Sequence, residues 1–249
     1  MPTHSIVVEN KCSREVIDPV YADLIEEAVA AYRDVFAERA LDIRLMGSVA
    51  RGEAVLGQSD IDFMALVQDA PSETERAAVR RHADRLGQEY PLVSRVDLDA
   101  SRPGDLHPGQ RFILSSDSLS LAGDDHLTRP RQTIGRRELA DLVTLDRDKL
   151  IRDYRTALLA VAPEDTAQLL FWSRVVGKDL LKCLRGAVLR EGGNYERNIA
   201  AIARQVAAHF PEHRAVIEHL FACYNEPTSE RETLLRLLDA TAHLPLDQH

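Results

Sequence analysis

The sequence lacks a long apolar segment, and this absence argues against a membrane-spanning protein. No apolar run approaches the ~20 residues that a membrane-spanning helix requires. The first twelve residues also lack the basic segment followed by a long apolar one that marks a secretion signal. These features predict a cytoplasmic protein that does not enter a membrane.

Cysteine is also scarce. The three cysteines, Cys12, Cys183 and Cys223, are odd in number and far apart, and none forms a CxxC pair or a zinc-ligand spacing. The nine histidines are likewise scattered without metal-ligand spacing. The sequence therefore favours reduced thiols.

Negative charge is concentrated in the first half of the chain. Residues 1–130 contain 14 Lys and Arg against 23 Asp and Glu, a net charge of −9, whereas residues 131–249 contain 17 of each kind. This imbalance argues against a broad nucleic-acid-binding surface in the first half. It fits a site that collects Mg²⁺ or a cationic substrate.

Residues 45–62, LMGSVARGEAVLGQSDID, contain the strongest motif of the chain. An apolar run ends at Gly47 and Ser48, a polar loop follows, and Asp60 and Asp62 open a second apolar run. In a strand, residues two apart project to the same face, so these two carboxylates lie side by side with Cα atoms roughly 6.5 Å apart. Such a pair is typical of a site for Mg²⁺ ions that share their ligands with phosphate oxygens.

The Gly47-Ser48 turn fits the phosphate half of that chemistry. Glycine allows the backbone to approach a ligand closely, and N–H groups at the start of a following helical turn attract phosphate. Together, the two pieces predict a metal site that faces a phosphate site.

Gly47-Ser48, an eleven-residue gap and Asp60-Ile61-Asp62 between two apolar strands resemble the signature of the DNA polymerase beta-type nucleotidyltransferase superfamily. The two pieces of sequence are most similar to its small bacterial branches, the minimal and the aminoglycoside nucleotidyltransferases. The resemblance implies an α+β fold, in which a small mixed sheet flanked by helices precedes a helical domain.

The family pattern also requires a third carboxylate on a neighbouring strand. The segment 92–100, LVSRVDLDA, is predicted to be that strand, and Asp97 fits best because apolar residues flank it. Asp99 would point the same way in an ideal strand and stays the alternative.

The resemblance implies Mg²⁺-dependent transfer of a nucleoside monophosphate, AMP from ATP or its counterpart from another NTP, to an acceptor hydroxyl with release of pyrophosphate. Asp60 and Asp62 would hold two Mg²⁺ ions, and Asp97 would bind the second ion and assist deprotonation. Ser48 and amides near Gly47 would hold the phosphates, and Arg51 would neutralise charge on pyrophosphate. The acceptor would be a small hydroxylated molecule, and a cationic aminoglycoside would connect the chain with antibiotic resistance.

Hydrophobic periodicity predicts the remaining organisation. It predicts helices over 19–39, 72–88, 136–160, 166–190, 195–210, 213–224 and 229–243, strands over 42–46, 63–67 and 92–100, a short helix or turn near 111–115, and no strand beyond residue 131. We therefore expect a nucleotidyltransferase domain over 1–130 and a bundle of about five helices over 131–249 that forms one wall of the substrate cleft.

One predicted helix carries basic residues along one side, namely Arg174, Lys178, Lys182 and Arg185, opposite an apolar side. A solvated helix face is the simpler interpretation. In aminoglycoside-modifying relatives a lysine of the helical domain reaches the nucleotide, and Lys178 is the first candidate for that role here.

The sequence is also compatible with other functions. The second enzymatic alternative is a nucleotidyltransferase of a toxin–antitoxin system, which acts on a protein or on tRNA. A non-catalytic module that binds a nucleotide or a partner is the alternative from a different class, and the retained carboxylates argue against it. Arg204 and His209 also match the Arg-x4-His pattern of helical ribonuclease domains, which we interpret as chance. Nothing in the sequence marks an oligomer interface.

Overall fold

The structure is a computed structural model that describes residues 5–244; residues 1–4 and 245–249, the outer ends of the two expected domains, lie outside the described part. The described chain forms two compact units. The sheet unit comprises residues 7–132, and the helical unit comprises residues 133–244 together with Ser5 and Ile6. Each unit has its own hydrophobic core. The predicted α+β class with a helical C-terminal part is confirmed.

The sheet unit contains a mixed four-stranded sheet in the order β4-β3-β2-β5. Its strands are β2 (Ala40–Met46), β3 (Ile61–Val67), β4 (Val96–Ser101) and β5 (Ser118–Gly123). β2 pairs antiparallel with both β3 and β5, whereas β3 and β4 run parallel. The antiparallel pairing of β2 with β3 places the motif loop at one end of the two central strands.

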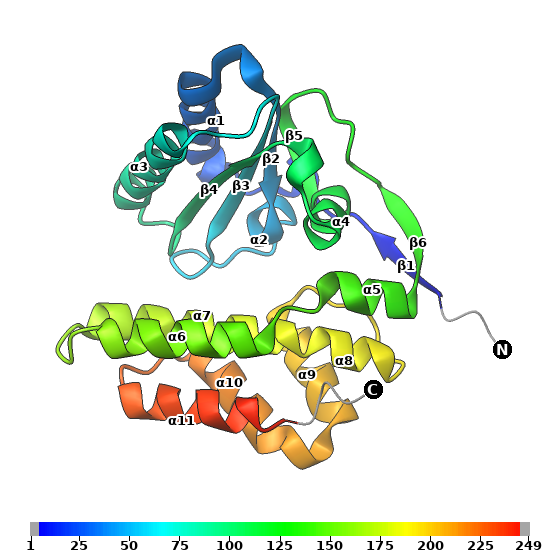
Figure 1. Cartoon of the computed structure of the whole chain (residues 1–249), viewed down its shortest axis with the longest axis vertical. Coiled ribbons are helices and arrows are strands. Elements are labelled where there is room, and N and C mark those ends of the chain that lie inside the picture. Colours follow the sequence, from blue (N-terminus) through cyan, green and yellow to red (C-terminus); the bar gives the residue numbers. More distant parts are fainter. Residues whose placement is uncertain (1–4, 245–249) are drawn as a thin grey trace. The chain divides into compact units, whose positions relative to one another are not determined.

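The two faces of this sheet have different chemistry. One face packs against α1 (Ala22–Phe36) and α3 (Glu73–Glu89), and α4 (Pro108–Ser116) contacts the other (Figure 1). The residues of β3 that enter the core with α1 and α3 alternate along the strand: Ile61, Phe63, Ala65 and Val67. Strand alternation then turns Asp62 and Met64 to the face that α4 partly covers. The polar residues of the motif therefore lie opposite the main core.

Local sequence signals explain where the helices of this unit begin. Ser72 accepts a hydrogen bond from the Glu75 amide, and the Glu75 side chain accepts one from the Ser72 amide. This reciprocal cap satisfies two amides that a helix start would leave unpaired, and it confirms the predicted start of α3. The helix predicted over 19–39 is also confirmed, with 3₁₀ turns on both sides of α1.

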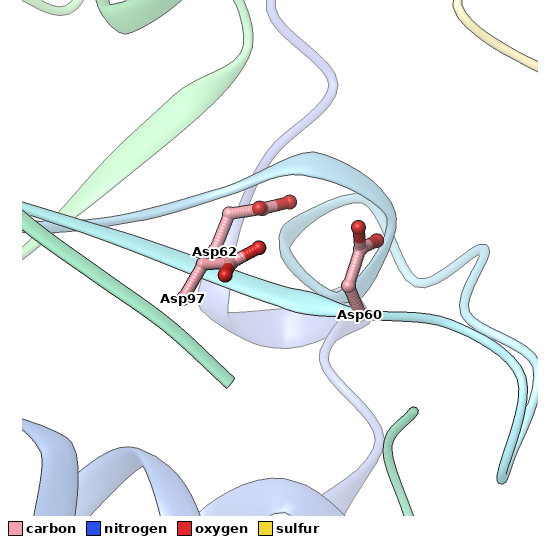
Figure 2. A group of neighbouring side chains, drawn as sticks. All are labelled: Asp60, Asp62 and Asp97. Atoms are coloured by element: carbon pink, nitrogen blue, oxygen red, sulfur yellow. The ribbon is translucent and has the colours of Figure 1, made fainter. Parts of the chain in front are cut away.

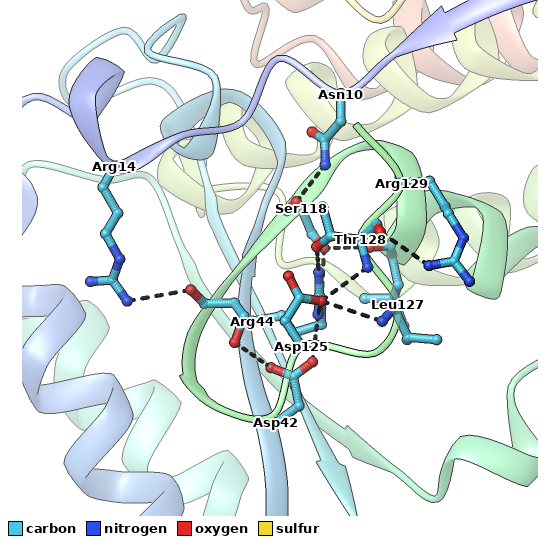
Figure 3. A network of polar contacts seen from close by, with 11 residues as sticks. Asn10, Arg14, Asp42, Arg44, Ser118, Asp125, Leu127, Thr128 and Arg129 are labelled. Carbon is cyan, nitrogen blue, oxygen red and sulfur yellow. Dashed lines mark hydrogen bonds and ion pairs between the residues drawn. The ribbon is translucent and has the colours of Figure 1, made fainter. Parts of the chain in front are cut away.

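A buried arginine on β2 ties the sheet to the loop after β5 (Figure 3). The Arg44 side chain is fully buried, forms an ion pair with Asp42 on its own strand and donates from Nε to the Ser118 hydroxyl at 2.8 Å. Its other nitrogens bind the Asp125 carboxylate at 2.9 Å and the Thr128 hydroxyl at 2.5 Å. The buried charge is thus surrounded by acceptors, as a charge removed from water requires.

Within residues 133–244, the helical unit has seven helices instead of about five. They are α5 (Arg136–Val143), α6 (Arg147–Ala160), α7 (Thr166–Cys183), α8 (Arg185–Arg190), α9 (Ile199–His209), α10 (Arg214–Asn225) and α11 (Arg231–Ala242). Two of the predicted helices are each divided in two. In the first, Asp146 caps α6 by accepting from the Lys149 amide, so the chain restarts a helix there.

The core of the helical unit allows close approach of two helices. A Cβ added to Gly177 on α7 would lie 2.4 Å from the Leu220 carbonyl oxygen on α10, so only glycine fits at this crossing. The apolar side predicted for α7 is buried, with Val176 and Leu180 in the core. Among the described residues, none of the helices is both long and apolar enough to cross a bilayer.

The prediction that no strand lies beyond residue 131 is wrong. Residues Arg131–Gly135 form β6, which pairs with β1 (Ser5–Glu9) in a two-stranded sheet. Side chains of β6 alternate between exposed and half-buried, so the strand has no fully buried face. Hydrophobic patterning detects a strand by its buried face and therefore missed this one.

Candidate active site

Three aspartates meet where β3 and β4 lie side by side. Asp60 immediately precedes β3, Asp62 is its second residue, and Asp97 on β4 is the register partner of Asp62. One carboxylate oxygen from each residue lies within 4.8 Å of the others, and all three side chains are half-buried. The carboxylates converge on the same space (Figure 2). We call Asp60, Asp62 and Asp97 the three-Asp cluster.

The cluster follows from the sequence through strand geometry. Asp60 and Asp62 are two residues apart and share a side of β3, as the alternation predicts. The parallel register then brings Asp97 beside Asp62. Asp99 does not join the cluster: it is exposed, and its carboxylate accepts a hydrogen bond from the adjacent Ala100 amide at 2.8 Å.

The donor set of the cluster fits a divalent cation of the Mg²⁺ type. Three carboxylates offer hard oxygen ligands, and Mg²⁺ binds through a small number of carboxylates while retaining positions for water or phosphate. Without a cation, three negative charges this close repel one another. The residues present are therefore compatible with the group that the resemblance implies.

The Gly47-Ser48 turn lies against the same cluster. A short helix, α2 (Gly47–Ala50), follows β2, and Gly47 adopts a positive φ of 77°. A Cβ at Gly47 would lie 3.0 Å from Oδ2 of Asp62, which is closer than a side chain normally tolerates. Glycine therefore serves both the backbone conformation and the close approach of the turn to the carboxylate. The half-buried Ser48 is the second residue of α2.

Arg51, the predicted phosphate ligand, has its guanidinium engaged by protein carboxylates. It binds both oxygens of Asp117 at 2.7 Å and Oε2 of Glu53 at 3.0 Å, and its side chain is only 7% exposed. Burial lowers the pKa of Arg51, but Asp117 and Glu53 outweigh burial and raise the pKa above its usual value. Asp117 precedes β5, so this ion pair fastens the end of α2 to the edge of the sheet.

Sequence reasoning missed a cation at the cluster, Arg95. Its Nη2 lies 2.5 Å from Oδ2 of Asp97 and 3.7 Å from Oδ2 of Asp60, and its Nε donates to Asp97 at 2.8 Å. Burial lowers the pKa of Arg95, but the charges of Asp97, Asp60 and Asp62 outweigh it and raise the pKa. A signal was available: Arg95 is two residues before Asp97, the spacing that places side chains on one side of a strand.

A pocket of about 250 Å³ opens beside the cluster on the α4 side of the sheet. Asp62, Asp97 and Asp99 form its acidic part. Its other walls come from the ends of β2 and β3 and from α4, namely Met46, Phe63, Met64, Gln110, Ile113 and Leu114. The pocket thus joins an apolar surface to the carboxylates.

Lys178, the predicted cation of the helical unit, lies in α7 and is half-buried. The basic residues predicted on one helix divide between two, because Arg185 is the first residue of α8. Lys182 contacts Asp179 at 3.7 Å, and the Arg185 guanidinium lies 5.7 Å from the ring centre of Tyr195. The role of Lys178 at a nucleotide stays a prediction.

Residues 5–244 have the α+β architecture of a nucleotidyltransferase fold, which the following likeness to a solved structure shows. A solved structure shares it: a spectinomycin adenyltransferase from Enterococcus faecialis, determined with ATP and spectinomycin, matches with a TM-score of 0.55 at 13% sequence identity. The match covers 89% of this chain and 99% of that one. A toxin–antitoxin structure with AMP-PNP matches over 40% of this chain and 73% of that one, with 21% identity and a TM-score of 0.33. Known protein families and curated proteins give no match.

Proposed function

We propose that this chain is a nucleotidyltransferase that moves AMP from ATP to a hydroxyl group of a small acceptor and releases pyrophosphate. The observation that carries the proposal is the three-Asp cluster on two parallel strands, with the Gly47 turn against Asp62. A new bond forms between the acceptor oxygen and the α-phosphorus, and the bond from that phosphorus to the β-phosphate bridge oxygen breaks. The acceptor hydroxyl loses its proton in the same exchange.

In this proposal, the residues of the sheet unit have the following roles. Asp60 and Asp62 would hold two Mg²⁺ ions, and Asp97 would hold the second ion and receive the hydroxyl proton. When bound, the ions supply charge neutralisation at the phosphates and make the hydroxyl more acidic. Ser48 and the first amides of α2 would bind the β- and γ-phosphates, because the first N–H groups of a helix lack partners within it.

Two basic residues take different parts in this proposal. Arg51 is a positioning residue, because its ion pair with Asp117 holds the end of α2 in place. Lys178 is the candidate that would bring a positive charge from the helical unit to the triphosphate. The acceptor is a small hydroxylated molecule, and the excess of negative charge in residues 1–130 favours a cationic one. An aminoglycoside-like acceptor would meet both conditions, and it is part of this proposal.

The proposal is tested by pyrophosphate release from each of the four NTPs with Mg²⁺, in the presence of aminoglycosides, hydroxylated metabolites, proteins or tRNA. We expect release with ATP and a small acceptor. The Asp60→Asn/Asp62→Asn variant should reduce it by about 10²-fold or more, the scale for losing a preorganised electrostatic partner.

Asp105→Asn is the matched control, because Asp105 is an exposed aspartate of the same unit that pairs with Arg102 away from the cluster. It should release pyrophosphate like the unmodified protein. Equal release by the cluster variant, or no binding of any nucleotide with Mg²⁺, would overturn the proposed function.

A further inference from the structure

Arg95 occupies the position of a counter-ion to the three-Asp cluster. Its guanidinium contacts Asp97 at 2.5 Å and approaches Asp60 at 3.7 Å. These same carboxylates are the proposed ligands of the divalent cation. The positive charge of Arg95 thus offsets part of the repulsion among the three carboxylates.

A metal ion bound by these carboxylates would compete with the Arg95 guanidinium. Mg²⁺ binds carboxylate oxygens at about 2.0–2.1 Å and demands near-ideal octahedral geometry. Oδ2 of Asp97 is the atom to which both Nε and Nη2 of Arg95 are directed. A cation bound there would face the guanidinium at a separation of a few ångströms, where like charges repel strongly.

The side chain of Arg95 is placed so that it can move away from the three-Asp cluster without a change in the backbone. It is 42% exposed, so its charged end can turn into water at little cost in solvation. Its backbone is held separately, because the Arg95 carbonyl accepts a hydrogen bond from the Ile61 amide at 3.0 Å. Side-chain rotation can therefore move the guanidinium while this backbone hydrogen bond beside Asp60 and Asp62 stays intact.

We propose that Arg95 is a displaceable counter-ion, which holds the three-Asp cluster in the metal-free protein and which a divalent cation must displace in order to bind. This inference rests on the proposed function, because it assumes that the cluster is the metal site. Its consequence is a weak affinity for a free cation. A cation that arrives with a triphosphate brings negative charge for the displaced guanidinium, so the metal–nucleotide complex is favoured over the metal alone.

The test measures Mn²⁺ binding without nucleotide, by the loss of the free-ion signal in electron paramagnetic resonance, for the unmodified protein and the variants Arg95→Gln, Arg95→Lys and Arg102→Gln. Arg95→Gln should bind Mn²⁺ about tenfold more tightly, because one competing charge beside the site is gone. Arg95→Lys keeps the charge and should bind like the unmodified protein. Arg102→Gln removes an exposed arginine that pairs with Asp105, and it should also leave the affinity unchanged.

Thermal stability gives a second test of whether a divalent cation displaces the Arg95 guanidinium. Without metal, Arg95→Gln should melt at a lower temperature than the unmodified protein, because the positive charge that Arg95 brings to Asp97 and Asp60 is lost. Saturating Mn²⁺ should raise the melting temperature of Arg95→Gln by more than that of the unmodified protein. Circular dichroism before melting verifies that each variant is folded. Unchanged or weaker Mn²⁺ affinity in Arg95→Gln overturns the proposal, and so does an Arg95→Lys variant that behaves like Arg95→Gln.

The outcomes separate this proposal from the proposed function. If Asp60→Asn/Asp62→Asn abolishes Mn²⁺ binding but Arg95→Gln does not strengthen it, only the counter-ion role fails. If Arg95→Gln binds Mn²⁺ more tightly but no acceptor yields pyrophosphate, the counter-ion role stands and the transferase activity fails. Absence of Mn²⁺ binding to the unmodified protein and to Arg95→Gln overturns both the metal site and the counter-ion.

Discussion

Gly47 brings the backbone of the turn after β2 close to the carboxylate of Asp62 in the three-Asp cluster. Its φ of 77° lies in the left-handed region, which costs a residue with a Cβ about 1–2 kcal/mol. The added Cβ of Gly47→Ala would also meet Oδ2 of Asp62 at 3.0 Å. We expect Gly47→Ala to lower the free energy of unfolding by about 1–2 kcal/mol and to weaken Mn²⁺ binding, because the Asp62 carboxylate must move.

The variant Gly57→Ala separates the effect of the backbone conformation from the effect of the contact with Asp62. Gly57 has a similar φ of 70°, but a Cβ there would meet no atom within 4 Å. Chemical denaturation should therefore give a similar loss of stability for both variants, while Mn²⁺ binding should fall only in Gly47→Ala. Equal metal affinity in the two variants would mean that the turn and the carboxylate are not coupled.

The three-Asp cluster was predictable from sequence, whereas for the cations around it only the spacing of Arg95 from Asp97 gave a signal. Asp60 and Asp62 share a side by strand alternation, and Asp97 follows from the family pattern of a third carboxylate on a neighbouring strand. Which carboxylate each arginine contacts depends on the tertiary structure. Arg51 lies in the motif, yet its main partner is Asp117, which is 66 residues away in the sequence. Arg95 also approaches Asp60 on another segment of the chain, and strand spacing alone does not give that contact.

At the scale of elements, the loop after β5 is held to the sheet by charge. Asp125 accepts hydrogen bonds from the Thr128 amide at 3.0 Å and from Arg44 at 2.9 Å. Burial raises the pKa of Asp125, but the hydrogen bonds from Thr128 and the charge of Arg44 outweigh it and lower the pKa to about 2. The ionised form of this carboxylate therefore fastens residues 124–129 to β2.

The lowered pKa makes this contribution dependent on pH. The ordinary pKa is 3.8, so the stabilisation is complete above about pH 4 and is lost as the pH falls toward 2. Asp125→Asn should reduce the free energy of unfolding at pH 7 by about 1 kcal/mol, a value discounted because the side chain is 37% exposed. Urea denaturation at several pH values should show this difference shrinking between pH 4 and pH 2.

Asp124→Asn is the control for Asp125→Asn, because Asp124 is the exposed neighbour in the same loop. It should change stability little at any of these pH values. A difference between Asp125→Asn and the unmodified protein that persists unchanged at pH 2 would show that the charge of Asp125 is not what holds the loop.

The elements that sequence patterns predicted are those with strong local signals or a buried face. The start of α3 follows from Ser72 and Glu75, and β3 follows from its apolar run. The division between α5 and α6 depends on the competition between continuing a helix and capping a new one at Asp146, which periodicity alone does not decide. The pairing of β1 with β6 joins segments more than 120 residues apart, so no local pattern contains it.

At the scale of the whole molecule, the proposed metal ligands and the phosphate turn all belong to the sheet unit, whereas Lys178 belongs to the helical unit. The change from strand patterns to helical patterns in the sequence predicted a domain boundary near residue 130. Patterning could not assign Ser5 and Ile6 to the helical unit, because that grouping depends on contacts between distant segments.

Because each unit has its own hydrophobic core, we expect a destabilising substitution in one unit to leave the other unit unaffected. Leu45 on β2 and Leu180 on α7 are both fully buried, each in the core of its own unit. Replacing either with alanine leaves a cavity that costs about 3 kcal/mol. In hydrogen exchange measured by mass spectrometry, Leu45→Ala should accelerate exchange in β2, β3 and α1 and leave α7 and α10 unchanged, and Leu180→Ala should do the reverse. If either variant accelerates exchange equally in both units, the chain unfolds as one cooperative body, and the two cores depend on each other for stability.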